Sequence, residues 1–330
     1  MSTVLLVGTG QVGVRAARQL VDTPGLDRVV IASRDPRRSA DLVEAMGDRA
    51  EPYSGDLDAP PQIPDGVTAV AVAAAAPDAY RWVRAAVAAG VAVAAVVDDG
   101  FGELEPLATD RGAPVVTGCG LGPGLTEVLA RHAADAFDAV DDVHVARVGA
   151  AGRACVEAAK DARGETPGEW RDGSWRTARA FGPELLWFPE PIGVRECQLV
   201  RSGVAACVAT VVDARYVTSR LGVPPTIGRI RRGLGRDPKD QGWGAARVEV
   251  SGWRDGVAGS LVYGVVDRTS VVAGVVLAVT AAGLAGGVDA GIDAPAGVRT
   301  LGEVTRPVPF LAELGRRGVK AAAFEGVVPH

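Results

Sequence analysis

The chain has 330 residues, of which 48% are hydrophobic and 23% are charged, with a formal net charge of −5 at pH 7. This composition excludes extensive disorder, and the length suits two domains rather than one small core. The weakly acidic balance gives no electrostatic reason to expect a nucleic-acid or anionic-membrane partner.

The first 125 residues alternate short apolar runs with helical patterns. The apolar runs, each expected to form a strand, are 4–7, 29–32, 67–73, 91–97 and 114–116, and the helical patterns cover 13–21, 39–46 and 79–89. Strands that are apolar throughout are typical of parallel sheets covered on both faces. The sequence therefore predicts an α/β fold in which residues 1–125 form a doubly wound parallel sheet.

A glycine-rich turn follows the first strand and leads directly into the first helix. Its residues are Gly8-Thr9-Gly10-Gln11-Val12-Gly13. In such a GxGxxG turn the first glycine permits the tight turn, the second lets a pyrophosphate approach the backbone, and the third lets the helix pack closely. The free amides of the helix then hold the phosphate charge. We expect a dinucleotide-binding Rossmann domain with these six residues at the cofactor.

The end of the second strand indicates which dinucleotide is bound. Sites for NAD usually carry an acidic residue here, whereas this chain has Ser33 and Arg34, with Arg37 just beyond. A hydroxyl and a guanidinium can bind a 2′-phosphate that a carboxylate would repel. We expect NADP(H), although Asp35 stands one position later, and we assign Asp56 to the same cofactor site.

The ends of later strands supply the remaining candidate site residues. Ala75 and Pro77 are small residues expected against the nicotinamide ribose. Asp98 and Asp99 follow a strand at the end where ligands bind in this fold, and they either serve the substrate or cap the next helix. Cys119 is either a proton donor or a small buried hydrophobe. We take both aspartates and Cys119 as the candidate catalytic residues.

The four cysteines are widely spaced, with no CxxC pair and no histidine at ligand spacing. We therefore expect neither a metal site nor a disulfide framework. No basic, cleavable segment precedes the first strand, which favours a cytoplasmic protein.

Beyond residue 125 the pattern changes to that of an α+β domain, expected over 126–268 and serving substrate binding and dimerisation. A helix is expected over 126–137, a strand over 140–147, and a hairpin formed by 247–253 and 260–266. The candidate substrate-binding residues are Trp175, Trp187 and Arg229. Core packing explains the tryptophans nearly as well, and a solvated loop is the alternative for the arginine.

Residues 269–330 are expected to form C-terminal helices that pack back on the Rossmann domain. The stretch 270–288 is almost free of charge and long enough to suggest a membrane span. Its glycines and alanines, and the absence of flanking anchors, instead favour a buried helix.

The segment Val116–Thr126, with its Gly-Pro-Gly-Leu turn, resembles the glycine-rich turn of the saccharopine dehydrogenase-like reductases. Further similar stretches are 75–77, 94–98 and 309–318, while 169–173 and 186–193 resemble a bacterial branch of that family. The resemblance is strong over 1–135 and looser thereafter. It implies a Rossmann domain, an α+β substrate domain and NAD(P)-linked chemistry at a C–N bond.

Together these patterns predict an NADPH-dependent oxidoreductase, expected as a homodimer. It would reduce an imine or iminium of a small amino-acid-derived substrate, or oxidise the corresponding amine. A carbonyl or sugar dehydrogenase of the glucose–fructose oxidoreductase type is an alternative, but those enzymes usually carry a lysine after the fifth strand and none lies between Val91 and Thr126. A noncatalytic NADP-binding sensor or scaffold is the other alternative.

Overall fold

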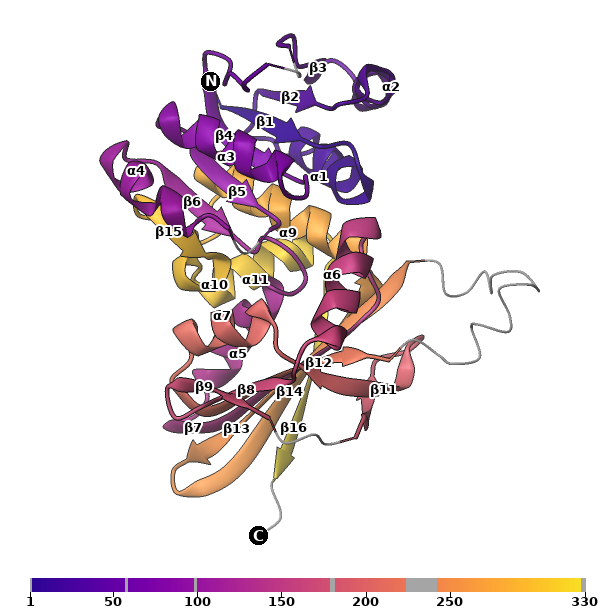
Figure 1. The fold of residues 1–330 in the computed structure, drawn as a ribbon, viewed down its shortest axis with the longest axis vertical. Coiled ribbons are helices and arrows are strands. Elements are labelled where there is room, and N and C mark those ends of the chain that lie inside the picture. The colour runs from indigo at the N-terminus through magenta and orange to yellow at the C-terminus, as the bar shows by residue number, and fades with distance from the viewer. Residues whose placement is uncertain (1, 57–58, 98–99, 179–181, 224–241, 328–330) are drawn as a thin grey trace, which may run out of the picture. The chain divides into compact units, whose positions relative to one another are not determined.

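The computed structural model describes residues 2–56, 59–97, 100–178, 182–223 and 242–327 (Figure 1). The chain forms two compact units. The first unit comprises 1–128 and 270–319, and the second comprises 129–269 and 320–330. The chain therefore passes from one unit to the other three times.

The first unit is built on a seven-stranded sheet in the order β15-β6-β5-β4-β1-β2-β3, in which every pairing is parallel. The strands are β1 (Thr3–Val7), β2 (Arg28–Ala32), β3 (Ala50–Pro52), β4 (Val67–Val72), β5 (Ala92–Ala95), β6 (Pro114–Thr117) and β15 (Gly297–Thr300). The order 3-2-1-4-5-6 within this sheet is that of a Rossmann domain. The predicted α/β fold is confirmed, with β3 and β15 as additional strands.

Helices connect these strands and cover the sheet (Figure 1). They are α1 (Gln11–Val21), α2 (Pro36–Met46), α3 (Asp78–Ala88), the short η1 (Gly102–Leu104), α4 (Glu105–Asp110), α10 (Leu301–Val304) and α11 (Pro307–Arg316). Two more, α5 (Leu125–Ala134) and α9 (Thr269–Leu284), contain two of the three points where the chain passes between units. All five residues of β1 are buried, as expected for a strand covered on both faces.

Helix α9 accounts for the uncharged stretch near residue 270. Its residues from Val275 to Ala282 are almost entirely buried, and Gly274 lies against α1, where an added Cβ would fall 2.5 Å from Cβ of Arg15. Among the described residues, no helix is long and apolar enough to cross a membrane.

The second unit contains a mixed nine-stranded sheet with the main order β10-β11-β12-β7-β13-β14-β16, and with β8 and β9 added beside β12. The strands are β7 (Ala139–Val148), β8 (Gly168–Arg171), β9 (Ser174–Thr177), β10 (Glu184–Phe188), β11 (Gly193–Val200), β12 (Ala214–Gly222), β13 (Trp243–Arg254), β14 (Val257–Arg268) and β16 (Ala321–Val327). Helices α6 (Arg153–Gly164) and α7 (Gly203–Val211) complete the unit. Strands β7 and β12 are parallel neighbours, and the other pairings are antiparallel.

The two faces of this sheet differ in character. On one face the buried side chains include Val143, Val145, Val217, Val248 and Val250, each 0% exposed. The alternate positions carry His144, Thr218, Arg220 and Glu249, and these are brought together because β7 pairs with β12 on one side and β13 on the other. One apolar and one polar face are the usual result of alternation along a strand.

The C-terminal region differs from the expected run of helices. Strand β15 extends the sheet of the first unit beside β6, and β16 pairs with β14 in the second unit. The prediction of helices throughout 269–330 was therefore wrong at both strands. Pairing with an available strand edge outweighs the helix propensity of small residues such as those at the start of β16.

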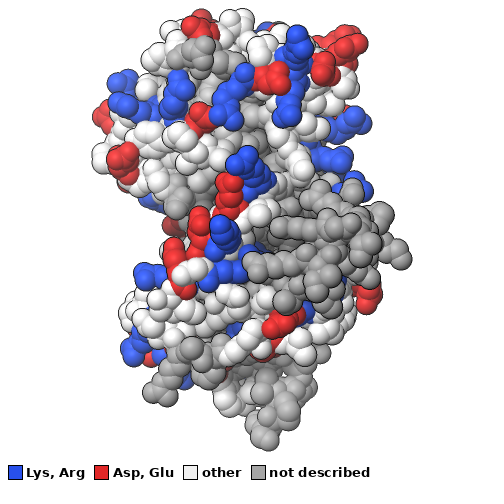
Figure 2. Space-filling model, turned by 45° about the vertical axis from the view of Figure 1, so that its right-hand side comes forward, with Lys and Arg blue, Asp and Glu red and all other residues white. Residues whose placement is uncertain are grey.

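Charged side chains lie next to partners of opposite sign on the face shown in Figure 2. Several ion pairs within each unit have both side chains exposed, for example Arg28–Glu51 and Arg153–Glu157. Because such exposed pairs contribute at most about 1 kcal/mol each, stability rests mainly on the buried apolar layers.

Candidate functional site

The glycine-rich turn lies where the strand order of the first unit reverses, between β1 and β4. Gly8 has φ +101°, its N–H donates to the Ala32 carbonyl at 2.8 Å, and an added Cβ would lie 3.0 Å from the oxygen of Ala73. An added Cβ on Gly13 would fall 1.9 Å from the oxygen of Gly8. Both positions therefore require glycine so that β1, β4 and α1 can approach one another.

Gly10 differs from these two glycines. It is the N-cap of α1 with extended backbone angles, and no side chain caps the helix there. An added Cβ would meet nothing within 4 Å. Since Gln11 and Val12 form the first turn, the free amides of α1 face open space at the edge of the sheet where Rossmann domains bind ligands. A pyrophosphate fits this cradle.

The Ser33 hydroxyl connects the end of β2 to the glycine-rich turn. Its Oγ lies 2.7 Å from Oγ1 of Thr9 and accepts a hydrogen bond from the Asp35 N–H at 3.2 Å. The Asp35 carboxylate accepts from the N–H groups of Arg37 and Arg38 and caps α2. Asp35 therefore serves as the N-cap of α2.

Arg34 projects from the end of β2 into solvent, with its side chain 86% exposed. One guanidinium nitrogen lies 3.0 Å from Oδ2 of Asp78, in the first turn of α3. The loop before α3 contains a cis peptide between Ala76 and Pro77, and the Ala75 carbonyl accepts from the Ala79 N–H. The loops that follow β2 and β4 are thus joined across the mouth of the candidate cofactor site.

Four other residues expected at the cofactor or substrate site are either exposed or outside the described residues. Asp56 is an exposed residue after β3. Asp98, Asp99 and Arg229 lie outside the described residues.

The Gly-Pro-Gly-Leu turn folds tightly on itself. An added Cβ on Gly124 would fall 2.2 Å from the oxygen of Gly118 and 2.5 Å from that of Gly120. The Glu127 carboxylate, 1% exposed, accepts from the Gly124 N–H and from the Thr126 hydroxyl. The glycine requirement at position 124 therefore comes from packing within the turn.

Cys119 lies inside this turn and is 0% exposed. Its Sγ–H donates to the Val116 carbonyl at 3.4 Å. Burial raises the pKa of the Cys119 thiol to about 12. Of the two interpretations that the sequence leaves open, these facts favour the buried hydrophobe over the proton donor.

The two candidate tryptophans of the second unit belong to different aromatic pairs. Trp175 on β9 packs edge-on to Trp170 with centroids 5.8 Å apart, beneath the guanidinium of Arg201. Trp187 on β10 is 44% exposed and contacts Phe324 of β16. Packing explains Trp175, whereas Trp187 leaves a large part of its ring available for contact.

A polar cluster on the second sheet was missed by sequence reasoning. His144 Nδ1 lies 2.7 Å from Oγ1 of Thr218, which accepts from a guanidinium N–H of Arg220 at 2.7 Å. Arg220 is 19% exposed and pairs with Glu184 at 2.9 Å. Because a guanidinium only donates, the Thr218 hydroxyl proton is left for a neutral His144 ring. The only signal was a partial alternation, with Asp142 and His144 two positions apart in β7, and Tyr216, Thr218 and Arg220 at every second position of β12.

Comparison with solved structures identifies the fold to which this arrangement belongs. No protein-family model matches the sequence, and no relative was found among curated proteins. Apo saccharopine dehydrogenase (L-Glu forming) from Saccharomyces cerevisiae superposes with a TM-score of 0.73 at 14% identity, covering 98% of this chain and 100% of that one. The chain has the saccharopine dehydrogenase fold.

A second solved structure with this arrangement is the DAP dehydrogenase of C. glutamicum in complex with DAP, with a TM-score of 0.51 at 12% identity. It covers 97% of this chain and 100% of that one. The resemblance inferred from the Gly-Pro-Gly-Leu turn is therefore confirmed at the level of the saccharopine dehydrogenase fold.

Proposed function

We propose that the protein is an NADP(H)-dependent oxidoreductase. The observation that carries this proposal is the uncapped amino end of α1 at Gly10, which opens at the point where the strand order reverses. Backbone amides and the helix dipole there favour the pyrophosphate of a dinucleotide. When bound, the nicotinamide supplies or accepts the hydride.

The preference for the 2′-phosphorylated cofactor rests on the end of β2. Arg34 is exposed and held near the turn by Asp78, and the Thr9–Ser33 hydroxyl pair retains one proton beyond the one it shares. A guanidinium and a hydroxyl are strong partners for a phosphate. Arg37, in the first turn of α2, adds positive charge nearby.

For the substrate we propose a small amino-acid-derived imine or amine, so that the bond changed is a C–N bond. Support comes from the sequence resemblance and from the fold shared with dehydrogenases named for saccharopine and DAP. An iminium nitrogen is already charged, so hydride transfer to its carbon needs no strong acid. This agrees with a candidate site that offers no exposed histidine–lysine pair among the described residues.

Several finer assignments remain predictions of this proposal. Asp98 and Asp99 are expected near the reacting centre, and Trp187 and Trp175 against the substrate. A cytoplasmic homodimer is expected as well.

The test has two steps. NADPH and NADH are first titrated against the protein by cofactor fluorescence, and NADPH should bind more tightly. Oxidation of NADPH is then followed with keto acids in the presence and absence of amines, and with simple carbonyl compounds and sugars. Absence of dinucleotide binding would contradict the proposal, and turnover of carbonyls or sugars without an amine would overturn the C–N assignment. Binding without any turnover would favour a sensor.

A further inference from the structure

The carboxyl end of α1 is held by two arginines that come from elsewhere in the first unit. Arg49 donates to the carbonyls of Val21, Thr23 and Leu26. Arg317, at the end of α11, donates to the Gln19 carbonyl at 3.2 Å. Because the last carbonyls of a helix lack partners within it and carry partial negative charge, guanidinium groups stabilise this end.

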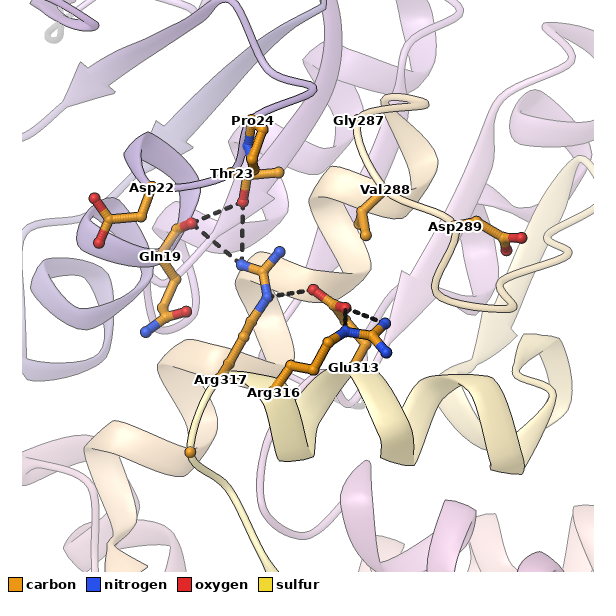
Figure 3. A pocket seen from close by; sticks show the side chains of 11 residues that line it. Gln19, Asp22, Thr23, Pro24, Gly287, Val288, Asp289, Glu313, Arg316 and Arg317 are labelled. Carbon is orange, nitrogen blue, oxygen red and sulfur yellow. Dashed lines mark hydrogen bonds and ion pairs between the residues drawn. The ribbon is translucent and has the colours of Figure 1, made fainter.

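Arg317 also contacts a side chain that is part of the same end. It donates to Oγ1 of Thr23 at 3.1 Å, and this hydroxyl donates to the Gln19 carbonyl at 2.8 Å. Figure 3 shows Arg317 reaching from α11 across a cavity of about 910 Å³ to this pair. Arg317 thus connects α11 to two positions four residues apart, Gln19 and Thr23, at the end of α1.

Glu313, one turn earlier in α11, fixes the position of Arg317. Its Oε1 accepts from Nε of Arg317 at 2.6 Å, and its Oε2 accepts from Nε of Arg316 at 2.8 Å. The Glu313 side chain is 8% exposed. Burial alone would raise the pKa of Glu313, but the hydrogen bonds from Arg317 and Arg316 outweigh it and lower that pKa. Glu313, Arg316 and Arg317 therefore form one ion-pair cluster, from which Arg317 links α11 to the end of α1.

We infer that Arg317 is a positioning residue for the dinucleotide, acting through α1. This inference rests on the proposed function. The helix is 11 residues long, about 16 Å at 1.5 Å per residue, and its open amino end is the part offered to the pyrophosphate. A helix whose other end is loosened must be ordered when the ligand binds, and this lowers affinity. Arg317 acts on the pyrophosphate subsite, so it serves NADPH and NADH equally.

Arg316 provides a matched control within the same cluster. It binds the same carboxylate, but its side chain is 63% exposed, against 11% for Arg317. The contacts described for Arg316 reach Glu313 and not α1. Both substitutions therefore remove one cation from Glu313, but only Arg317→Ala also removes the hydrogen bonds to the end of α1.

The experiment compares dissociation constants and binding stoichiometry for NADPH and NADH in Arg317→Ala, Arg316→Ala and the unmodified protein. We expect Arg317→Ala to weaken both nucleotides by about fivefold, within the usual range of coupling between sites, and Arg316→Ala to change either by less than about twofold. Hydrogen exchange over residues 18–26 should show protection by NADPH that is reduced in Arg317→Ala. Arg317→Lys, which keeps a cation at the helix end, should restore part of the affinity.

Thr23→Val is the second variant, used if Arg317→Ala does not fold. It removes the hydroxyl that receives Arg317 while keeping the shape of the side chain, and it should weaken both nucleotides in the same direction. Equal dissociation constants for Arg317→Ala and Arg316→Ala would overturn the inference. The inference would also be overturned if Arg317→Ala bound fewer nucleotides per protein with an unchanged dissociation constant, because partial unfolding gives that result. Failure of the unmodified protein to bind either nucleotide would instead overturn the proposed function.

Discussion

Helices α1 and α6 lie in different units, and each begins at a glycine N-cap with no side-chain hydrogen bond to its first turn. An added Cβ on either cap, Gly10 or Gly152, would meet nothing within 4 Å. Beyond the cap they differ. Helix α1 buries a face against β1 and β2 and is held at its carboxyl end by arginines, whereas no residue of α6 is buried and its C-cap is Glu165.

Because of this difference we expect a ligand at the start of α1 and none at the start of α6. The start of α1 stands at the reversal of a parallel sheet, on a helix held at its carboxyl end. The start of α6 has comparable free amides, but it follows β7 in a mixed sheet whose one described parallel pair is β7 with β12, so it does not stand at such a reversal.

The sharpest test of the comparison is to add the same side chain to both caps. Gly10→Val should reduce NADPH affinity at least about 100-fold, since the side chain would occupy the phosphate position and forfeit several charge-assisted hydrogen bonds. Gly152→Val is the matched control and should leave affinity unchanged. Fluorescence titration measures both, with circular dichroism to check folding. Similar affinities in the two variants would remove the distinction between the helices.

A second test addresses the residues beside α1. Arg34→Ala should weaken NADPH by about tenfold and leave NADH nearly unchanged, because one charge-assisted contact contributes roughly 1.5–3 kcal/mol. Arg153→Ala removes a comparably exposed arginine at the start of α6 and serves as control. The measurement is the ratio of the dissociation constants for NADH and NADPH in each variant. If Arg34→Ala leaves this ratio unchanged, the 2′-phosphate assignment is rejected.

The polar cluster of the second sheet predicts a pH dependence of stability. Burial lowers the pKa of His144 and the Arg220 guanidinium lowers it further, against the opposing effects of Asp142, Glu249 and Glu184. The unfolded chain therefore takes up the proton first as pH falls below about 6.5, and stability is lost over that range.

Thermal unfolding at pH 7.5 and 5.5 measures this effect. The melting temperature should be lower at pH 5.5 than at pH 7.5, and this decrease should be smaller by a few degrees in His144→Gln. His132→Gln, which removes an imidazole from α5, should retain the full decrease. An equal decrease in all three proteins would exclude His144 as the source.

The smallest expected effect concerns two cysteines, one in the Gly-Pro-Gly-Leu turn and one on α6. Cys155 is exposed and should react quickly with a thiol reagent at pH 8, whereas Cys119 is buried and should react only on unfolding. Cys155→Ser should remove the fast phase. Cys119→Ala should then leave turnover within about twofold, since loss of a small buried contact affects stability rather than chemistry. A large loss of turnover without loss of stability would restore Cys119 as a catalytic candidate.

The first unit was predictable from sequence because its physical signals are local. The apolar run before Gly8 and the helix after it appear in the structure as β1 and α1, since a buried parallel strand must be apolar throughout. Strand β15 was not found, because Gly297–Thr300 is short and pairs with β6, which lies 183 residues earlier in the chain (Gly297 with Pro114). Pairing over such a sequence distance leaves no local pattern.

The second unit was less predictable for the opposite reason. Helix α7 (Gly203–Val211) is rich in valine, alanine and cysteine and resembles a strand in composition, while β12 beside it carries polar residues on both faces and so lacks a clear alternation. The His144–Thr218–Arg220 cluster depends on the register of β7 against β12, which sequence patterns do not specify. The strand–turn–helix arrangement around Gly8 could therefore be derived in advance, and the polar cluster of the second sheet could not.

The division of the first unit into 1–128 and 270–319 has a consequence for biosynthesis. On the ribosome, domains generally fold as units in the order in which they emerge. Here β1 belongs to a unit whose last helix, α11, begins 304 residues later in the chain, at Pro307. The second unit has almost all of its sequence in one continuous stretch and is the part able to fold first. The nascent Rossmann sheet, lacking β15, α9 and α11, would meanwhile expose apolar surface, and this interval is when a chaperone would be needed most.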